Sequence, residues 1–341
     1  EVMEQAQREL LSLNGKGLSI LEISHRSKDF MAIIDGAEAG VRKAFGVPDN
    51  YRVLFLQGGA SLQFGMIPMN LLQGGSADYV HTGEWAKKAI KEAKRFGTVN
   101  IAATSEDENF NYIPCELNLT PGARYVHITS NETIGGIQWQ QYPQTGTVPL
   151  VGDMSSDIFC RPVDVTRFGL IYAGAQKNIG PSGVTLVIIR DDLVEAGSKD
   201  LTTMLQYRTH AENGSMYNTP PCFGVYIIKL VMDWLERQGG VAEMEKINRQ
   251  KADLLYKAID DLPMYRGTAR VDDRSIMNVT FRLSTEELEE KFIAQATAAG
   301  MVGLKGHRSV GGCRASIYNA MNLEGVQALV DFMEKFAKEN A

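Results

Sequence analysis

Short apolar runs alternate with longer amphipathic stretches over most of this 341-residue chain. The stretches between the runs have helical spacing, as in EWAKKAIKEAKRF (84–96), where Thr82 is the expected helix cap. Because strands that alternate with helices favour parallel pairing, we predict an α/β fold with a mostly parallel, seven-stranded sheet flanked by helices. The seven expected buried strands are VLFLQG (53–58), DYVHTG (78–83), VNIAAT (99–104), RYVHITS (124–130), VPLVGD (148–153), FGLIYAG (168–174) and VTLVIIR (184–190).

The pattern changes after NTPPCFGVYIIKLVMDWLERQGG (218–240), which predicts a long helix ended by a glycine pair. A charged helix follows, then the expected strands IMNVTFRL (276–283) and CRASIY (313–318), each followed by a helix. This order is typical of a smaller α+β domain. We therefore predict three parts, namely an N-terminal helical segment at 1–15, a large domain at 16–242 and a small C-terminal domain at 243–341.

The composition excludes several classes of function. The chain has 35 Lys and Arg against 41 Asp and Glu, a net charge of −6, and no basic run, so nucleic acid and anionic membranes are not expected partners. Its apolar runs are too short to span a membrane, and its first residues read as an amphipathic helix, not a signal peptide. Four scattered cysteines predict free thiols, a cytoplasmic location and no metal site.

Three strand ends carry residues suited to chemistry, and strand ends are where such sheets bind ligands. The first expected strand ends in Gly58-Gly59-Ala60-Ser61, which opens a helix and could hold an anion on free N–H groups. Asp153 ends another strand, and Lys177 follows a third in IYAGAQKNIGPSG, without an acid nearby. The plain alternatives are a tight turn, a helix cap and a solvated loop lysine, respectively.

Together these three features fit pyridoxal phosphate. That cofactor needs a lysine amine for a Schiff base, an aspartate beside its pyridinium nitrogen and a cradle for its phosphate. Asp153 precedes Lys177 by 24 residues, which leaves room for one connection and one strand, so both can reach one sheet edge. A partly desolvated amine has a lowered pKa and is a better nucleophile. We therefore assign Lys177 and Asp153 as the catalytic residues.

The sequence also resembles a known family over nearly its whole length. HTGEW, SNETIGG, IYAGAQKNIGPSG, GSMYNTPP, GGVAEM and LKGHRSVGGCRASIYNAM are similar to segments of the phosphoserine aminotransferases. These are pyridoxal-phosphate enzymes of fold type I within the class V aminotransferases. The resemblance implies a transaminase that interconverts 3-phosphohydroxypyruvate plus L-glutamate with O-phospho-L-serine plus 2-oxoglutarate, in serine biosynthesis. A further role in pyridoxine biosynthesis, through 4-phosphohydroxythreonine, is left open.

The same resemblance assigns cofactor contacts. Trp85 would stack on the pyridine ring, and Thr133 would hydrogen-bond near its oxygen substituent or the phosphate. Their plain alternatives are a core aromatic and a helix cap. The phosphate contacts implied by the resemblance are Ala60, Ser61 and Gln176, with Asn218 and Thr219 reaching the neighbouring subunit. Some members have Gly-Arg in place of Ala60-Ser61, so the phosphate here would have less cationic support. The composite site implies a homodimer.

Substrate contacts follow from the resemblance and from charge. Both amino-group carriers present an α-carboxylate and a second anion, and the arginine fork binds oxyanions with two hydrogen bonds. Arg314 would hold the α-carboxylate. The distal phosphate or glutamate side chain would meet His25 and Arg26, and His307 and Arg308 from the other subunit. Taken singly, each could be a plain surface residue. The remaining histidines, His81, His127 and His210, are expected to be structural.

Three alternative functions stay open at this point. Another class V enzyme, such as a cysteine desulfurase, would need a mobile cysteine, whereas Cys313 lies in an apolar strand context that favours packing. A nicotinamide-dependent oxidoreductase would need a glycine-rich fingerprint, which is missing. A non-catalytic homologue would not need to keep Lys177 and Asp153.

Overall fold

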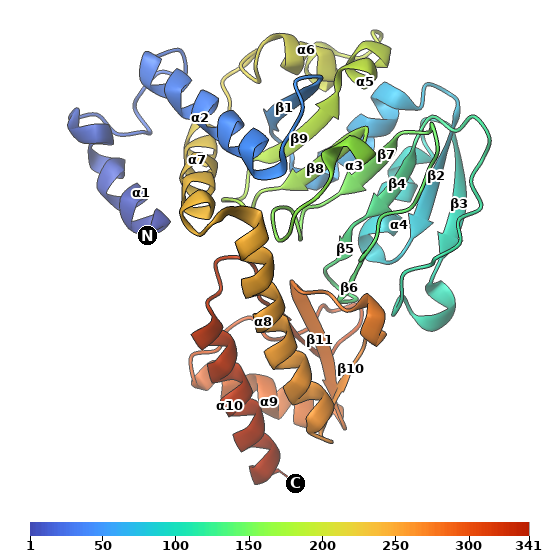
Figure 1. Cartoon of the computed structure of the whole chain (residues 1–341), viewed down its shortest axis with the longest axis vertical. Coiled ribbons are helices and arrows are strands. Elements are labelled where there is room, and N and C mark those ends of the chain that lie inside the picture. The colour runs from blue at the N-terminus through green and yellow to red at the C-terminus, as the bar shows by residue number, and fades with distance from the viewer. Residues whose placement is uncertain (341) are drawn as a thin grey trace.

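The computed structural model describes residues 1–340, which form a large α/β body joined by one long helix to a smaller α+β body (Figure 1). The sheet of the large body has seven strands in the order β1-β9-β8-β7-β4-β2-β3. Only β9 runs antiparallel to its neighbours, so the predicted mostly parallel, seven-stranded sheet is confirmed. These strands are β1 (Tyr51–Leu56), β2 (Ser76–His81), β3 (Thr98–Thr104), β4 (Val126–Thr129), β7 (Leu150–Asp153), β8 (Leu170–Gly174) and β9 (Thr185–Arg190).

Both faces of this sheet are buried, which explains why its strands are continuously apolar. Side chains alternate along a strand, so in β8 Ile171 packs into one core and Tyr172 into the other. The first core lies beneath α2 and α7, and the second beneath α3, α4, α5 and α6. The helices of the large body are α1 (Val2–Leu11), α2 (Lys28–Phe45), α3 (Gly59–Leu71), α4 (Glu84–Ala93), α5 (Asp191–Ala196), α6 (Tyr207–Glu212) and α7 (Cys222–Arg237).

One helix boundary differs from the prediction. The cap residue of α4 is Gly83 and not Thr82, whose hydroxyl is buried without a hydrogen-bond partner among residues 1–340. Gly83 has no side chain to cap the helix, and the first turn of α4 takes its acceptor from another element, described below. The expectation that Thr82 caps this helix is therefore wrong, because tertiary structure supplies the acceptor.

The smaller body has its own core. A three-stranded antiparallel sheet, ordered β10-β11-β12, packs with three helices around a second set of buried residues that includes Phe281 and Phe292. Helix α8 crosses the predicted domain boundary at residue 242, and the division into 1–15, 16–242 and 243–341 stays a prediction. The elements are α8 (Gly240–Asp261), β10 (Tyr265–Gly267), β11 (Asn278–Leu283), α9 (Glu286–Ala298), β12 (Cys313–Ser316) and α10 (Leu323–Glu339).

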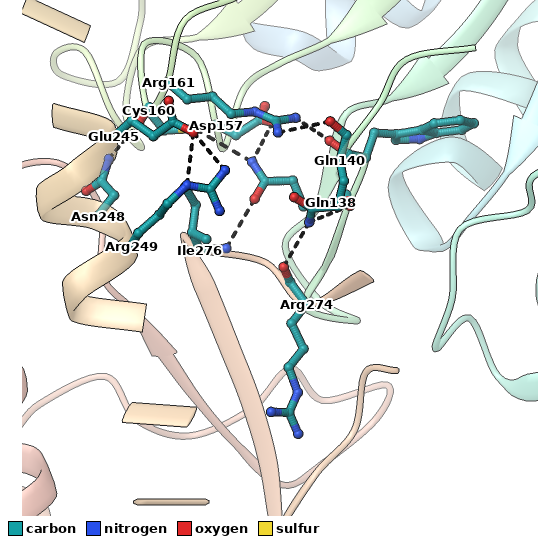
Figure 2. Close-up of polar contacts among 11 residues, drawn as sticks. Gln138, Gln140, Asp157, Cys160, Arg161, Glu245, Asn248, Arg249, Arg274 and Ile276 are labelled. Carbon is teal, nitrogen blue, oxygen red and sulfur yellow. Dashed lines mark hydrogen bonds and ion pairs between the residues drawn. The ribbon is translucent and has the colours of Figure 1, made fainter. Parts of the chain in front are cut away.

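A short hairpin, β5 (Asn131–Glu132) and β6 (Ile137–Gln138), connects the two bodies. The side chain of Gln138 lies at the centre of this junction (Figure 2). Its amide nitrogen donates to Asp157 at 3.0 Å, and its oxygen accepts from the backbone N–H of Ile276 at 3.1 Å. In this hairpin, β6 ends at Gln138, and the other strand, β5, begins beside the strand ends of the large sheet. The position of the small body is therefore tied to the edge where ligand chemistry is expected.

Candidate active site

Lys177 lies in the turn that follows β8, at the carboxyl edge of the sheet. Its Nζ donates to Thr133 Oγ1 at 2.7 Å and lies 4.9 Å from the centre of the Trp85 ring. Thr133 follows β5, and Trp85 lies in the first turn of α4. Three segments that are distant in sequence thus meet at one amine. Lys177 is therefore not a solvated loop lysine, the alternative that the sequence alone allowed.

Asp153 ends β7, the strand next to β8, and is only 5% exposed. Its Oδ1 accepts from the N–H of Ser155 at 2.9 Å and from the Ser155 hydroxyl at 2.6 Å. Ser155 Oγ also accepts from Gly174 N–H at 3.1 Å, which ties the ends of the two strands together. Burial raises the pKa of Asp153, while the bonds from Ser155 and the charge of Lys177 lower it. Asp153 therefore does not lie in a surface turn, and its carboxyl does not cap a helix.

The charge of Lys177 depends on groups from both bodies of the molecule. Burial lowers the pKa of its amine. The carboxylates of Asp153 and Glu132 raise that pKa, and the guanidinium of Arg314 lowers it again. An amine with a lowered pKa is more often unprotonated near neutral pH, which suits a nucleophile and a general base.

Glu132 is a buried carboxyl that the sequence reasoning missed. It is 1% exposed, and it accepts hydrogen bonds from the backbone N–H groups of Trp85 at 3.4 Å and Ala86 at 3.1 Å. Burial raises its pKa to about 7, although those two hydrogen bonds lower it. The available signal was an acid next to Thr133, directly after a buried strand.

Ala60 and Ser61 lie in the first turn of α3, directly after β1. Gly58 and Gly59 have φ of 88° and 65°, and no side chain caps the helix. The first N–H groups of a helix lack internal partners, so this turn can accept an anion. Gln176 is exposed and folds against Gly174, where an added Cβ would lie 2.7 Å from its Oε1.

Arg314 and His307 line one cavity of about 640 Å³ between the small sheet and the loop that contains Asn111. Arg314 lies on β12, opposite Thr280, and its Nε has no hydrogen-bond partner among residues 1–340. His307 Nδ1 is 2.7 Å from Ser309 Oγ, and Arg308 on the same loop is exposed and lines a second hollow, to which His307 also contributes. Of these basic residues, Arg314 is the one whose charge is among the main influences on the pKa of Lys177, which it lowers.

His25, Arg26, Asn218 and Thr219 lie apart from this group. His25 Nδ1 is 3.5 Å from Thr219 Oγ1, and the carbonyl of Thr219 accepts from Gln57 at 3.2 Å. No hydrogen bond joins any of the four to Lys177 in the part of the chain that the structure describes. The single chain therefore brings together Lys177, Asp153, Thr133 and Trp85, with Arg314 near, and leaves His25, Arg26, Asn218 and Thr219 apart from them.

Several other side chains have structural roles, as expected. His127 is buried, with Nε2 at 2.9 Å from the Tyr172 hydroxyl, and His210 Nε2 is 2.9 Å from the carbonyl of Met204. Cys313 is 2% exposed in the core of the small body, and all four cysteines are free. Among residues 1–340, no cluster of acidic, histidine and cysteine side chains could hold a metal, and no helix could span a membrane.

Comparison with known proteins agrees with this geometry. A sequence model of the aminotransferase class-V family matches residues 1–329. The phosphoserine aminotransferase of Desulfosudis oleivorans is 59% identical over 99% of this chain and 95% of that protein. The phosphoserine aminotransferase structure from Bacillus circulans subsp. alkalophilus superimposes with a TM-score of 0.98 at 53% identity, over 100% of this chain and 95% of the other. That from Trichomonas vaginalis, solved with PLP bound, has a TM-score of 0.93 at 38% identity, over 98% and 96%.

The fold is that of a class V aminotransferase of fold type I, and the chain belongs to that class. Within the class, it belongs to the phosphoserine aminotransferase family.

The effect of the surrounding charges on the pKa of Lys177 can be tested by pH titration. Because Arg314 lowers the pKa of Lys177, Arg314→Gln should raise that pKa, and because Asp153 raises it, Asp153→Asn should lower it. The measurement is the pH dependence of acylation of Lys177, followed by mass spectrometry in protein stripped of any cofactor. Arg314→Lys keeps the positive charge and is the control. The same titration midpoint in all four proteins would contradict this electrostatic description.

Proposed function

We propose that this chain is a pyridoxal-phosphate-dependent phosphoserine transaminase, an enzyme of serine biosynthesis. It interconverts 3-phosphohydroxypyruvate plus L-glutamate with O-phospho-L-serine plus 2-oxoglutarate. The observation that carries the proposal is the partly buried Lys177 amine, held by Thr133 beside the buried strand-end Asp153, in a member of the phosphoserine aminotransferase family.

The residues present fit pyridoxal phosphate. The Lys177 amine lies over the indole ring of Trp85, 4.9 Å from its centre, so an aromatic ligand held by that amine could pack against this ring. Both hydrogen bonds from Ser155 reach Asp153 Oδ1, so Oδ2 of this carboxyl can accept from a pyridinium N–H. The uncapped first turn of α3, with Ala60 and Ser61, supplies N–H donors to a phosphate.

When bound, pyridoxal phosphate supplies a reactive aldehyde and an electron-accepting ring that makes the proton on the substrate α-carbon acidic. Lys177 would hold the cofactor through its amine and, once that amine is free, would act as the general base and acid that moves this proton. Asp153 would keep a positive charge on the ring nitrogen and so stabilise the negative charge that develops in the transition state. Trp85 and Thr133 would orient the ring.

Substrate recognition is assigned to the basic residues. Arg314 is half-buried with an unpartnered Nε, and it faces the Lys177 side of the small body, which suits the α-carboxylate. His307 shares its cavity, and Arg308 lies on the same loop. These two, with His25 and Arg26, are proposed to bind the distal phosphate or the glutamate side chain.

We also propose a homodimer in which Asn218 and Thr219 complete the partner's phosphate site with Gln176. Asn218 lines a hollow of about 140 Å³ together with Leu62 and Met204, which are 36% and 39% exposed. Tyr217 beside it is 49% exposed. Exposed apolar side chains around polar anion donors are typical of a surface that a second protein covers. A cytoplasmic location is proposed as well, and the four free thiols support it.

The cofactor assignment predicts one labelled lysine. The purified holoenzyme should absorb in the visible range, and borohydride should bleach it and fix the cofactor to Lys177. Lys177→Ala should lose transamination by several orders of magnitude, since the same amine binds the cofactor and moves the proton. Lys88→Ala is the matched control, because Lys88 also lies over the Trp85 ring, at 4.3 Å, but is exposed. A label on any lysine other than Lys177 would contradict the assignment.

The composite site predicts a link between assembly and cofactor retention. Thr219→Ala should weaken cofactor binding by about 1 kcal/mol, roughly fivefold in Kd, the scale of one lost hydrogen bond. The measurement is cofactor Kd by spectroscopic titration, together with the mass in solution by light scattering. Thr203, an exposed residue outside the hollow around Asn218, provides the control Thr203→Ala. A fully active monomer at working concentration would rule out the composite site.

The substrate assignment predicts a split between two arginines. An unpaired buried phosphate is costly, so Arg308→Ala should lower kcat/KM for phosphoserine by about 30-fold or more and change the value for alanine little. Arg314→Ala should lower both values, because both substrates have an α-carboxylate. The measurement is the ratio of kcat/KM for phosphoserine to kcat/KM for alanine, compared between the wild type and both variants. An unchanged ratio in Arg308→Ala would show that Arg308 does not bind the phosphate.

A further inference from the structure

Glu132 is a buried titratable group for which the proposed mechanism has no use. It lies in the two-residue strand β5, next to Thr133, and is 1% exposed. A buried carboxyl without hydrogen-bond partners is strongly destabilising, so its partners indicate why it is there. Those partners are the N–H groups of Trp85 and Ala86, at 3.4 and 3.1 Å.

The two N–H groups belong to the first turn of α4, where a helix has no internal acceptors. The cap residue, Gly83, has no side chain to act as a hydrogen-bond acceptor. Glu132, from another part of the chain, supplies the acceptor instead. The fit is close. A Cβ on Gly83 would lie 2.7 Å from Glu132 Cδ and 2.8 Å from Oε2, so the glycine is needed to let the carboxyl reach the helix.

The ring of Trp85 depends on this anchor. Its indole N–H has no hydrogen-bond partner within residues 1–340, so no polar bond fixes the ring directly. Its place beside Lys177 follows from the backbone of the first turn of α4 and from packing. Glu132 acts on Lys177 too, because its negative charge raises the pKa of that amine.

We propose that Glu132 is a positioning residue that fixes the Trp85 ring over the cofactor by holding the first turn of α4, and that Gly83 is the glycine this contact requires. The inference rests on the proposed function, in which Trp85 stacks on the pyridine ring. It adds a second route by which the small body influences the site. Glu132 belongs to the β5–β6 hairpin, and that hairpin is bonded through Gln138 to Ile276 (Figure 2).

The test compares Glu132→Ala and Glu132→Gln with a matched buried carboxyl. Asp78 is fully buried and accepts from the backbone N–H of Thr120 at 2.8 Å, but lies within β2, away from the strand end, so Asp78→Asn is the control. Two readouts are taken on holoenzymes. They are hydrogen exchange of the Trp85 and Ala86 amides by NMR or mass spectrometry, and circular dichroism of the cofactor in the visible range.

For Glu132→Ala we expect exchange at Trp85 and Ala86 to be about tenfold faster, the scale of losing hydrogen bonds to a charged acceptor. The visible dichroism should lose a large part of its intensity, since it reports the asymmetric contact of ring and cofactor. Glu132→Gln keeps one acceptor oxygen and should be intermediate in both readouts. Asp78→Asn should lower the melting temperature while leaving both readouts at wild-type values.

A Glu132→Gln protein with wild-type exchange at Trp85 and Ala86 and wild-type dichroism would overturn the proposal, whatever its melting temperature. If Glu132→Ala does not fold, Gly83→Ala gives the second measurement, because it forces the carboxyl away from the helix. It should reproduce the faster exchange and the weaker dichroism, and wild-type values would again overturn the proposal. Failure of the proposed function would be seen separately, as absence of transamination in the wild type, and the exchange data would still decide whether Glu132 holds α4.

Discussion

The amine of Lys177 is a basic group that is partly removed from water, and the site is organised around this constraint. Burial disfavours the charged form, so the state of the amine depends on Asp153 and Glu132 on one side and Arg314 on the other. The two carboxyls come from the large sheet and the hairpin beside it, while Arg314 comes from the small sheet. The pKa of this amine therefore depends on groups from both bodies of the molecule.

The arrangement of strands makes this meeting possible. In a sheet whose strands β2, β4, β7 and β8 are parallel, their carboxyl ends lie along one edge, and the residues after them can converge. Ser155 bonds the ends of β7 and β8 to each other, so Asp153 and the turn leading to Lys177 are held in fixed register. Helices on both faces bury the apolar side chains of the sheet in two cores.

Sequence reasoning found the residues that stand at strand ends, because a continuous apolar run followed by a polar residue is visible without coordinates. It located the seven strands and both Asp153 and Lys177 in this way. It missed Glu132 and misassigned the cap of α4 to Thr82, for one shared reason. The acceptor for α4 is 46 residues away from Ala86 in the sequence, and no local pattern encodes a contact of that range. The expectations for Trp85, Thr133 and Arg314 came from family resemblance and not from spacing.

The sequence by itself determined the class of fold, the order of strands and helices, and the identity of the two residues that end β7 and follow β8. These are set by apolar periodicity and by turn residues, which act over a few positions. Only the tertiary structure decided that the Lys177 amine is buried against Thr133 and Trp85, that Glu132 caps α4, and that Arg314 from the other body influences the amine. The physical reason is that desolvation and charge depend on what lies around a group in space, and the neighbours of Lys177 named here come from four other segments of the chain.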